Sequence, residues 1–126
     1  MADIDVVVKP SIINFIGVPV DDDFSAVFTV TQTVNGVTTP LDLTGAQVQT
    51  NIVASLALAQ PPSLLLMTST PSVGLTDGKV TVSATAAQLN ALGIGAKYYA
   101  MRVRKNAFDR TAFMGVFQLI ATPVWN

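Results

Sequence analysis

The 126-residue chain carries 7 basic and 8 acidic side chains, and it contains neither histidine nor cysteine. This composition excludes the proton shuttle that histidine supplies near neutral pH, as well as thiolate nucleophiles, disulfide bonds and zinc–thiolate sites. We therefore expect no enzyme activity and no cofactor. The formal net charge of −1 gives no electrostatic reason to expect a nucleic-acid partner.

Hydrophobic residues make up 50% of the chain and charged residues only 12%, whereas disordered chains are rich in charge and poor in apolar residues. The length fits one domain with a single core, which we take as residues 1–126 with an N-terminal arm at about residues 1–10. The low charge leaves the surface poorly protected against association. We expect a partner to cover part of it; a neutral monomer is the alternative.

Alternation of apolar and polar residues with a period of two is the dominant signal, and this pattern is typical of half-buried strands. In the first such segment, Phe24, Ala26, Phe28 and Val30 share the inner face. The strands predicted by alternation are, in chain order, Phe24–Thr31, Gln47–Ile52, Lys79–Ala84 and Tyr98–Arg104.

The segment 55–72 has the weakest strand pattern, and we predict only a short strand at Leu64–Thr68 within it. The most apolar stretch, Ile52–Met67, is shorter than the roughly 20 residues that span a bilayer. It is also interrupted by Gln60-Pro61-Pro62. We therefore expect no membrane partner.

The last strand, Ala112–Ala121, is apolar on both faces. Phe113, Phe117 and Leu119 share one face, while Met114, Val116 and Ile120 lie on the other. A strand buried on both faces has this pattern. It is either a central strand with a loop folded over its outer face, or a strand whose outer face meets another subunit.

Turn residues separate the strands. Asn35-Gly36 predicts a tight hairpin, because both residues tolerate a positive φ, and Asp77-Gly78 predicts a turn. We expect a short hairpin loop at Asn106–Arg110. A single helix is predicted over Ala86–Leu92, with Thr85 as its N-cap and Gly93 as its terminator. Proline disfavours a central strand, which applies to the segments around Pro40, Pro61, Pro62 and Pro71.

These elements predict an all-β fold, an immunoglobulin-like antiparallel β-sandwich of about seven to eight strands with one short connector helix. A small β-barrel is the alternative.

Few residues could carry chemistry. Asp21-Asp22-Asp23 could bind a calcium ion, but its spacing differs from that of a calcium-binding EF-hand loop, and we favour a solvated turn. Asp42, Thr44 and Gly45 are interpreted as a structural turn in which side chains bond to nearby backbone.

Basic residues gather near the C-terminal hairpin beside Tyr98 and Tyr99. We favour a solvated strand face over base stacking for them, with contact to an acidic partner as a third option. They are Lys97, Arg102, Arg104, Lys105 and Arg110.

Five segments in order resemble a family of small virion proteins of tailed bacteriophages, namely the immunoglobulin-like N-terminal domains of upper baseplate proteins and related short tail or neck proteins. Pro40–Val48 is the most telling of them. The others are Asp22–Val30, Asp77–Ala84 leading into the predicted helix, Tyr98–Val103 and Gly115–Leu119. The resemblance implies a structural protein located in the virion and made in the host cytoplasm. It would form a homo-oligomer, with trimers or hexamers plausible from virion symmetry, and would bind other virion proteins.

Within that class, attachment to the tail, neck or baseplate is favoured over decoration of the capsid. A more distant alternative is a monomeric module that binds carbohydrate or peptide through Tyr98, Tyr99 and Trp125; a small-molecule ligand is otherwise not expected. The residues predicted to contact neighbours are Val6, Val7, Val8, Leu56, Leu58, Leu64, Leu65, Leu66, Met114, Val116 and Ile120.

Overall fold

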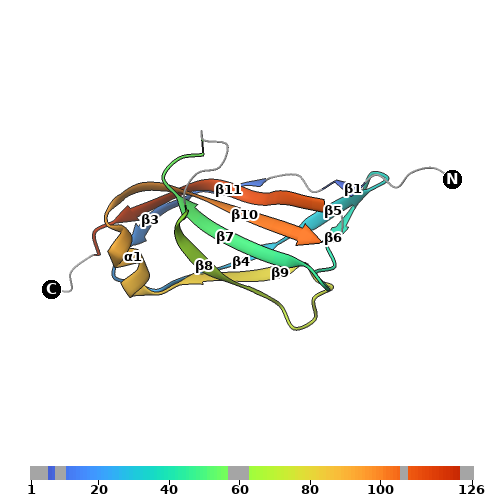
Figure 1. The fold of residues 1–126 in the computed structure, drawn as a ribbon, viewed down its shortest axis with the longest axis horizontal. Coiled ribbons are helices and arrows are strands. Elements are labelled where there is room, and N and C mark those ends of the chain that lie inside the picture. Colours follow the sequence, from blue (N-terminus) through green and yellow to red (C-terminus); the bar gives the residue numbers. More distant parts are fainter. Residues whose placement is uncertain (1–5, 8–10, 57–62, 106–107, 123–126) are drawn as a thin grey trace.

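A computed structural model of the chain describes residues 6–7, 11–56, 63–105 and 108–122. Within these residues the fold has eleven strands and one helix (Figure 1). The strands are β1 (Val6–Val7), β2 (Ser11–Ile12), β3 (Phe15–Pro19), β4 (Phe24–Thr29), β5 (Thr31–Val34), β6 (Val37–Pro40), β7 (Gln47–Val53), β8 (Ser63–Pro71), β9 (Lys79–Ala84), β10 (Gly95–Lys105) and β11 (Phe108–Ile120); the helix is α1 (Ala86–Leu92).

Strand β8 joins the two layers of the fold. Its first half pairs with β7, where Leu65 lies opposite Ile52, and its second half pairs with β9, where Thr70 lies opposite Thr81. One layer is therefore β11–β10–β7 with β2 and β3 along β11, and the other is β8–β9–β4 (Figure 1). The two layers form a sandwich-like fold, which confirms the predicted all-β, sandwich-like architecture.

The core lies between these layers and is filled by the side chains that alternation assigns to the inner faces. Val80 and Val82 of β9 and Met101 and Val103 of β10 are all at most 1% exposed. Thr50 is the one buried polar residue found among the described residues, and its hydroxyl oxygen accepts a hydrogen bond from Ser69 Oγ at 2.9 Å. The period-two pattern therefore predicted the core faces correctly.

The helix and the Asn35-Gly36 turn also match the prediction. Helix α1 starts after the N-cap Thr85, whose hydroxyl accepts from the backbone N–H of Gln88, and its C-cap is Gly93. Asn35 and Gly36 both have positive φ, +50° and +82°, and connect β5 to β6. This hairpin forms a separate three-stranded sheet with β1 at one end of the sandwich (Figure 1).

Four details differ from the prediction, the first being the number of strands, which is eleven and not about seven to eight. Strand β8 is longer than Leu64–Thr68 because it spans both layers, and Pro71 is its last residue, where it pairs with β9 alone. Strand β11 already begins at Phe108, so Asp109 and Arg110 belong to a strand and not to a hairpin loop. The sandwich is not wholly antiparallel, because β2 and β3 pair with β11 in parallel.

Candidate interaction surface

The outer face of the β11–β10–β7 layer brings together residues that are far apart in the sequence. Residues directly opposite each other in paired strands point to the same side of a sheet. Leu66 of β8 lies opposite Asn51, Asn51 opposite Ala100, Ala100 opposite Met114, and Met114 opposite Ile12 of β2. This row crosses five strands, and the next outward pair along β10 and β11 is Tyr98 and Val116.

We call the apolar part of this face the outer band; it consists of Ile12, Leu64, Leu66, Tyr98, Met114 and Val116. Ile12 is 74% exposed, Leu66 54% and Leu64 45%, while the other three are half-buried. Large apolar side chains at such exposure form the kind of surface that monomeric proteins seldom leave uncovered. The outer band combines two separately predicted contact elements, the leucine segment and the outer face of the last strand.

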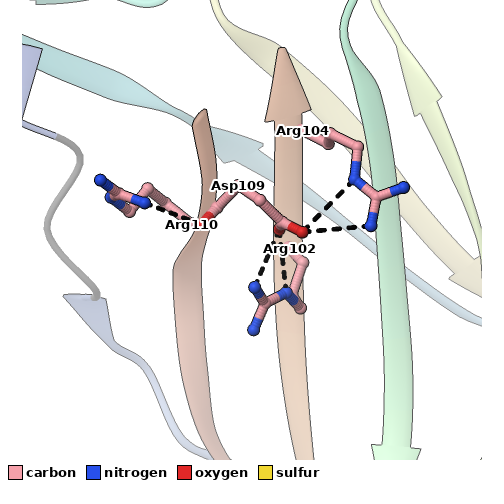
Figure 2. Close-up of polar contacts among 4 residues, drawn as sticks. All are labelled: Arg102, Arg104, Asp109 and Arg110. Atoms are coloured by element: carbon pink, nitrogen blue, oxygen red, sulfur yellow. Dashed lines mark hydrogen bonds and ion pairs between the residues drawn. The ribbon is translucent and has the colours of Figure 1, made fainter. Parts of the chain in front are cut away.

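Beyond the outer band, the same face ends in a charged cluster. Asp109 receives hydrogen bonds from Arg102 (Nη2–Oδ1, 2.8 Å) and from Arg104 (Nη2–Oδ2, 3.1 Å), and Figure 2 shows both guanidinium groups converging on it from β10. These hydrogen bonds hold the pKa of the Asp109 carboxyl below its usual value. Gln47 and Gln49 of β7 border a shallow hollow beside the cluster.

The predicted basic group does not act as one patch. Arg102 and Arg104 are exposed and paired with Asp109, and Arg110 donates to the carbonyl oxygen of Asp109 at 3.1 Å. Lys105 instead donates through Nζ to the carbonyl oxygen of Asp42. Lys97 lies opposite Phe117, on the face of β10 that turns inward. This arrangement leaves Arg102 and Arg104 on a solvated strand face, whereas Arg110 lies opposite Val103 on the other face of the sheet.

Several predicted contact residues lie outside the outer band. Leu65, which we predicted to contact a neighbour, points inward opposite Ile52 and packs against the core. Ile120 is half-buried, with its Cδ1 3.8 Å from the position that a Cβ on Gly17 would take. Leu56 is half-buried after the end of β7.

The N-terminal candidates have a different position. Val6 and Val7 form β1, opposite Val34 and Thr33 of β5. Val8 and Leu58 lie outside the described residues. Strand β1 therefore adds to a sheet of its own chain.

The Asp42 turn has the geometry of a local structural motif. Asp42 Oδ1 accepts from the backbone N–H of Thr44 at 2.9 Å, and Gly45 has a φ of +74°. The hydrogen bonds from Thr44 lower the pKa of Asp42. On either side, Leu41 and Leu43 are buried at 2% and 1% exposure. The turn carries these two leucines into the core.

The acidic run Asp21–Asp23 bonds to the helix. Asp23 Oδ1 accepts from the backbone N–H of Ala86 at 2.7 Å, and Asp21 Oδ1 accepts from Asn90 Nδ2. Among the described residues, no group of three or more acidic side chains is arranged to hold a metal ion. Two of the three carboxylates therefore join the β3–β4 turn to α1.

Sequence reasoning missed the segment around Ile12–Asn14. Its contacts depend on Gly115 of β11, where an added Cβ would lie 2.1 Å from the carbonyl oxygen of Ile13. Asn14 Oδ1 accepts from the backbone N–H of Val116 at 2.9 Å. A glycine inside a strand pattern is a sign of close backbone approach and was the available signal, although it does not reveal which segment approaches.

Comparison with known proteins identifies no family, since neither a protein-family model nor a curated protein sequence matches the chain. In the described part of the chain, no helix has the length and apolar character needed to cross a bilayer.

Proposed function

We propose that the chain is a structural protein of the tailed-bacteriophage virion that associates with copies of itself and attaches to a larger assembly in the tail, neck or baseplate. The observation that carries this proposal is the outer band, where apolar residues from β2, β8, β10 and β11 lie on one exposed face. The resemblance of five sequence segments to baseplate-type domains supplies the virion context.

The mechanism is burial of apolar surface, without a chemical step. Removing apolar surface from water is worth about 25 cal/mol per Å², and a standard interface buries about 800 Å² on each partner. Tyr98, Met114 and Val116 would lie at the centre of such a contact, with Leu66 on β8 and Ile12 on β2 at its two ends. The charged cluster at Asp109 would lie at its rim, where ion pairs set orientation more than affinity.

In the alternative, a glycan-binding module, one of the three aromatic residues proposed to contact the sugar is buried. Tyr99 is 1% exposed, so it cannot stack against a sugar on the surface. Tyr98 is half-buried within the outer band, and Trp125 lies outside the described residues. The exposed aliphatic side chains of the outer band favour a protein neighbour over a carbohydrate.

The test compares Leu66→Asp with Val73→Asp in the phage that produces the chain. Both changes replace an exposed aliphatic side chain with a carboxylate. Val73, which is 102% exposed, lies in a turn away from the outer band. Quantitative mass spectrometry of purified particles measures incorporation, and cryo-electron microscopy locates the chain. We expect the Val73→Asp chain to be incorporated normally. Incorporation of the Leu66→Asp chain should fall at least about tenfold, because burying an unpaired carboxylate in the contact costs several kcal/mol.

Three outcomes oppose the proposal. Absence of the native chain from particles overturns the virion role. Equal incorporation of both variants overturns the role of the outer band. Density for the chain on the head shell would mean that it decorates the capsid and does not attach to the tail.

A further inference from the structure

Strand β4 has a free edge, and the direction of its backbone groups can be derived from the ladder. The backbone N–H of Val30 donates to the carbonyl oxygen of Gly78 at 2.8 Å, continuing the register in which Phe28 lies opposite Val80. In an antiparallel pair, hydrogen-bonded and non-hydrogen-bonded pairs alternate. The backbone groups of Phe24, Ala26 and Phe28 therefore point to β9.

The intervening residues Ser25, Val27 and Thr29 direct their backbone N–H and C=O groups away from β9. Among the described residues, β4 has no strand neighbour other than β9, and no backbone hydrogen bond outside the ladders involves these three residues. Because unpaired backbone groups on a sheet edge form a template for another strand, β4 offers a ready pairing site.

From this geometry we propose that β4 pairs with β4 of a second copy of the chain, antiparallel and about a two-fold axis, with Val27 opposite Val27. This edge is a different surface from the outer band, so the dimer goes beyond the proposed function and can fail while that function stands. The pairing would add six backbone hydrogen bonds, two from each of three hydrogen-bonded residue pairs, since each such pair exchanges two bonds.

The strand lacks the devices that normally protect an edge. Proteins block edges with lysine, proline, bulges or inward-pointing charges. Strand β4 has the sequence Phe-Ser-Ala-Val-Phe-Thr, without charge or proline, and its six-residue register with β9 has no shift. The edge strand of the other layer, β3, contains Gly17, ends at Pro19 and pairs with a register shift. The contrast makes β4 the more open edge.

The outward side chains of β4 are self-complementary. In the proposed register Ser25 lies opposite Thr29 of the second copy, and Val27 lies opposite Val27. Directly opposed hydroxyl residues and opposed branched residues both stabilise a sheet. A second copy therefore fits this edge better than a strand of arbitrary sequence.

Charge selects the antiparallel direction. The acidic run Asp21–Asp23 immediately precedes β4, and Lys79 lies opposite Thr29 at the other end. Parallel pairing would put two acidic runs side by side. Antiparallel pairing brings the acidic end of each copy next to the Lys79 end of the other.

Apolar side chains lie on both faces of β4. Phe15 of β3 contacts the rings of Phe24 and Phe28 of β4, with centroids 5.1 and 5.9 Å apart, so β3 and β4 border the same opening between the layers. Val27 of β4 is 64% exposed, and its side chain lies on the outer face of the β8–β9–β4 layer, away from the rings of Phe24 and Phe28. A second copy along β4 would reduce the exposure of Val27.

The first experiment measures mass by sedimentation equilibrium over a range of concentrations for the native chain, Val27→Lys and Thr81→Lys. Thr81 is exposed on the same sheet face and lies directly opposite Val27, but on β9 and away from the edge. We expect a dimer for the native chain and for Thr81→Lys. For Val27→Lys the dimer dissociation constant should rise at least about tenfold, because like charges meet at the axis.

The second experiment tests the register by mixing Val27→Lys with Val27→Asp. Each variant alone should be monomeric, and the mixture should form a dimer that contains one copy of each, because the axis then pairs opposite charges. A monomeric native chain, a dimer that survives Val27→Lys, equal loss with Thr81→Lys, or a mixture that stays monomeric would each overturn the proposal.

Discussion

The hydroxyl of Tyr99 donates a hydrogen bond to the carbonyl oxygen of Ile13 over 2.7 Å, joining β10 to a segment 86 residues earlier in the chain. The backbone N–H of Ile13 in turn donates to the carbonyl oxygen of Met114 at 3.1 Å. Because Gly115 has no side chain, the backbone at Ile13 can approach β11 closely. These contacts hold the segment that carries Ile12 into the outer band.

The first prediction concerns Tyr99→Phe. The ring of Tyr99 packs against Phe15, with centroids 5.4 Å apart, and phenylalanine keeps that packing while removing the hydroxyl. The Ile13 carbonyl then loses its partner, so we expect a loss of about 1–2 kcal/mol in the free energy of unfolding, read from urea denaturation. Tyr98→Phe is the control, expected within about 0.5 kcal/mol of the native chain because it lies on the outer face. Equal stability of the two variants would contradict the structural role of this hydrogen bond.

The second prediction concerns alkaline pH. Burial raises the pKa of Tyr99 from 10.0 to about 12, so between these values the unfolded chain loses a proton that the folded chain retains. Below pH 10 the group has no effect, and as pH rises through the window stability falls by up to about 2–3 kcal/mol. Urea denaturation between pH 9 and 12 should give a steeper decline for the native chain than for Tyr99→Phe. Parallel pH curves would show that Tyr99 does not retain its proton.

The third prediction separates backbone strain from a steric clash. Gly78 and Gly36 both have positive φ, +69° and +82°. A Cβ on Gly78 would lie 2.3 Å from the carbonyl oxygen of Val30, whereas a Cβ on Gly36 would meet nothing within 4 Å. Gly36→Ala should cost about 1–2 kcal/mol for the left-handed backbone. Gly78→Ala should lower the free energy of unfolding by a further 1–3 kcal/mol, roughly the range for overpacking, or prevent the chain from folding. Equal thermal midpoints for the two variants would mean that the Val30 backbone moves aside without cost.

The sequence predicted the elements whose signals are local. Thr85 and Gly93 bracket α1, and the alternation from Phe24 and from Val80 marks strands with one face in the core. Each of these patterns arises within a few residues of the chain. The helix and the inner faces could therefore be read without knowledge of the pairing.

The missed features depend on contacts between distant segments. Strand β8 pairs with a strand of each layer. Its Leu64 and Leu66 are exposed although they are apolar and lie in a strand, so their hydrophobicity did not reveal which face they occupy. The parallel pairing of β2 with β11 joins residues about one hundred positions apart, as for Ile12 and Met114. The outer band exists only because these registers bring its members onto one face of the sheet, and no local pattern encodes that alignment.

The last prediction tests the register of β8 with adjacent residues. Leu65 lies opposite Ile52 and packs against the core, whereas Leu66 lies opposite Asn51 and is 54% exposed. Leu65→Asp buries an unpaired carboxylate and should cost more than about 3 kcal/mol or prevent folding. Leu66→Asp should stay within about 0.5 kcal/mol of the native chain, as measured by urea denaturation followed by circular dichroism. Because a shift of one residue turns every side chain of a strand to the opposite face, the reverse order of stabilities would show that β8 is displaced by one position and that Leu65, not Leu66, faces outward.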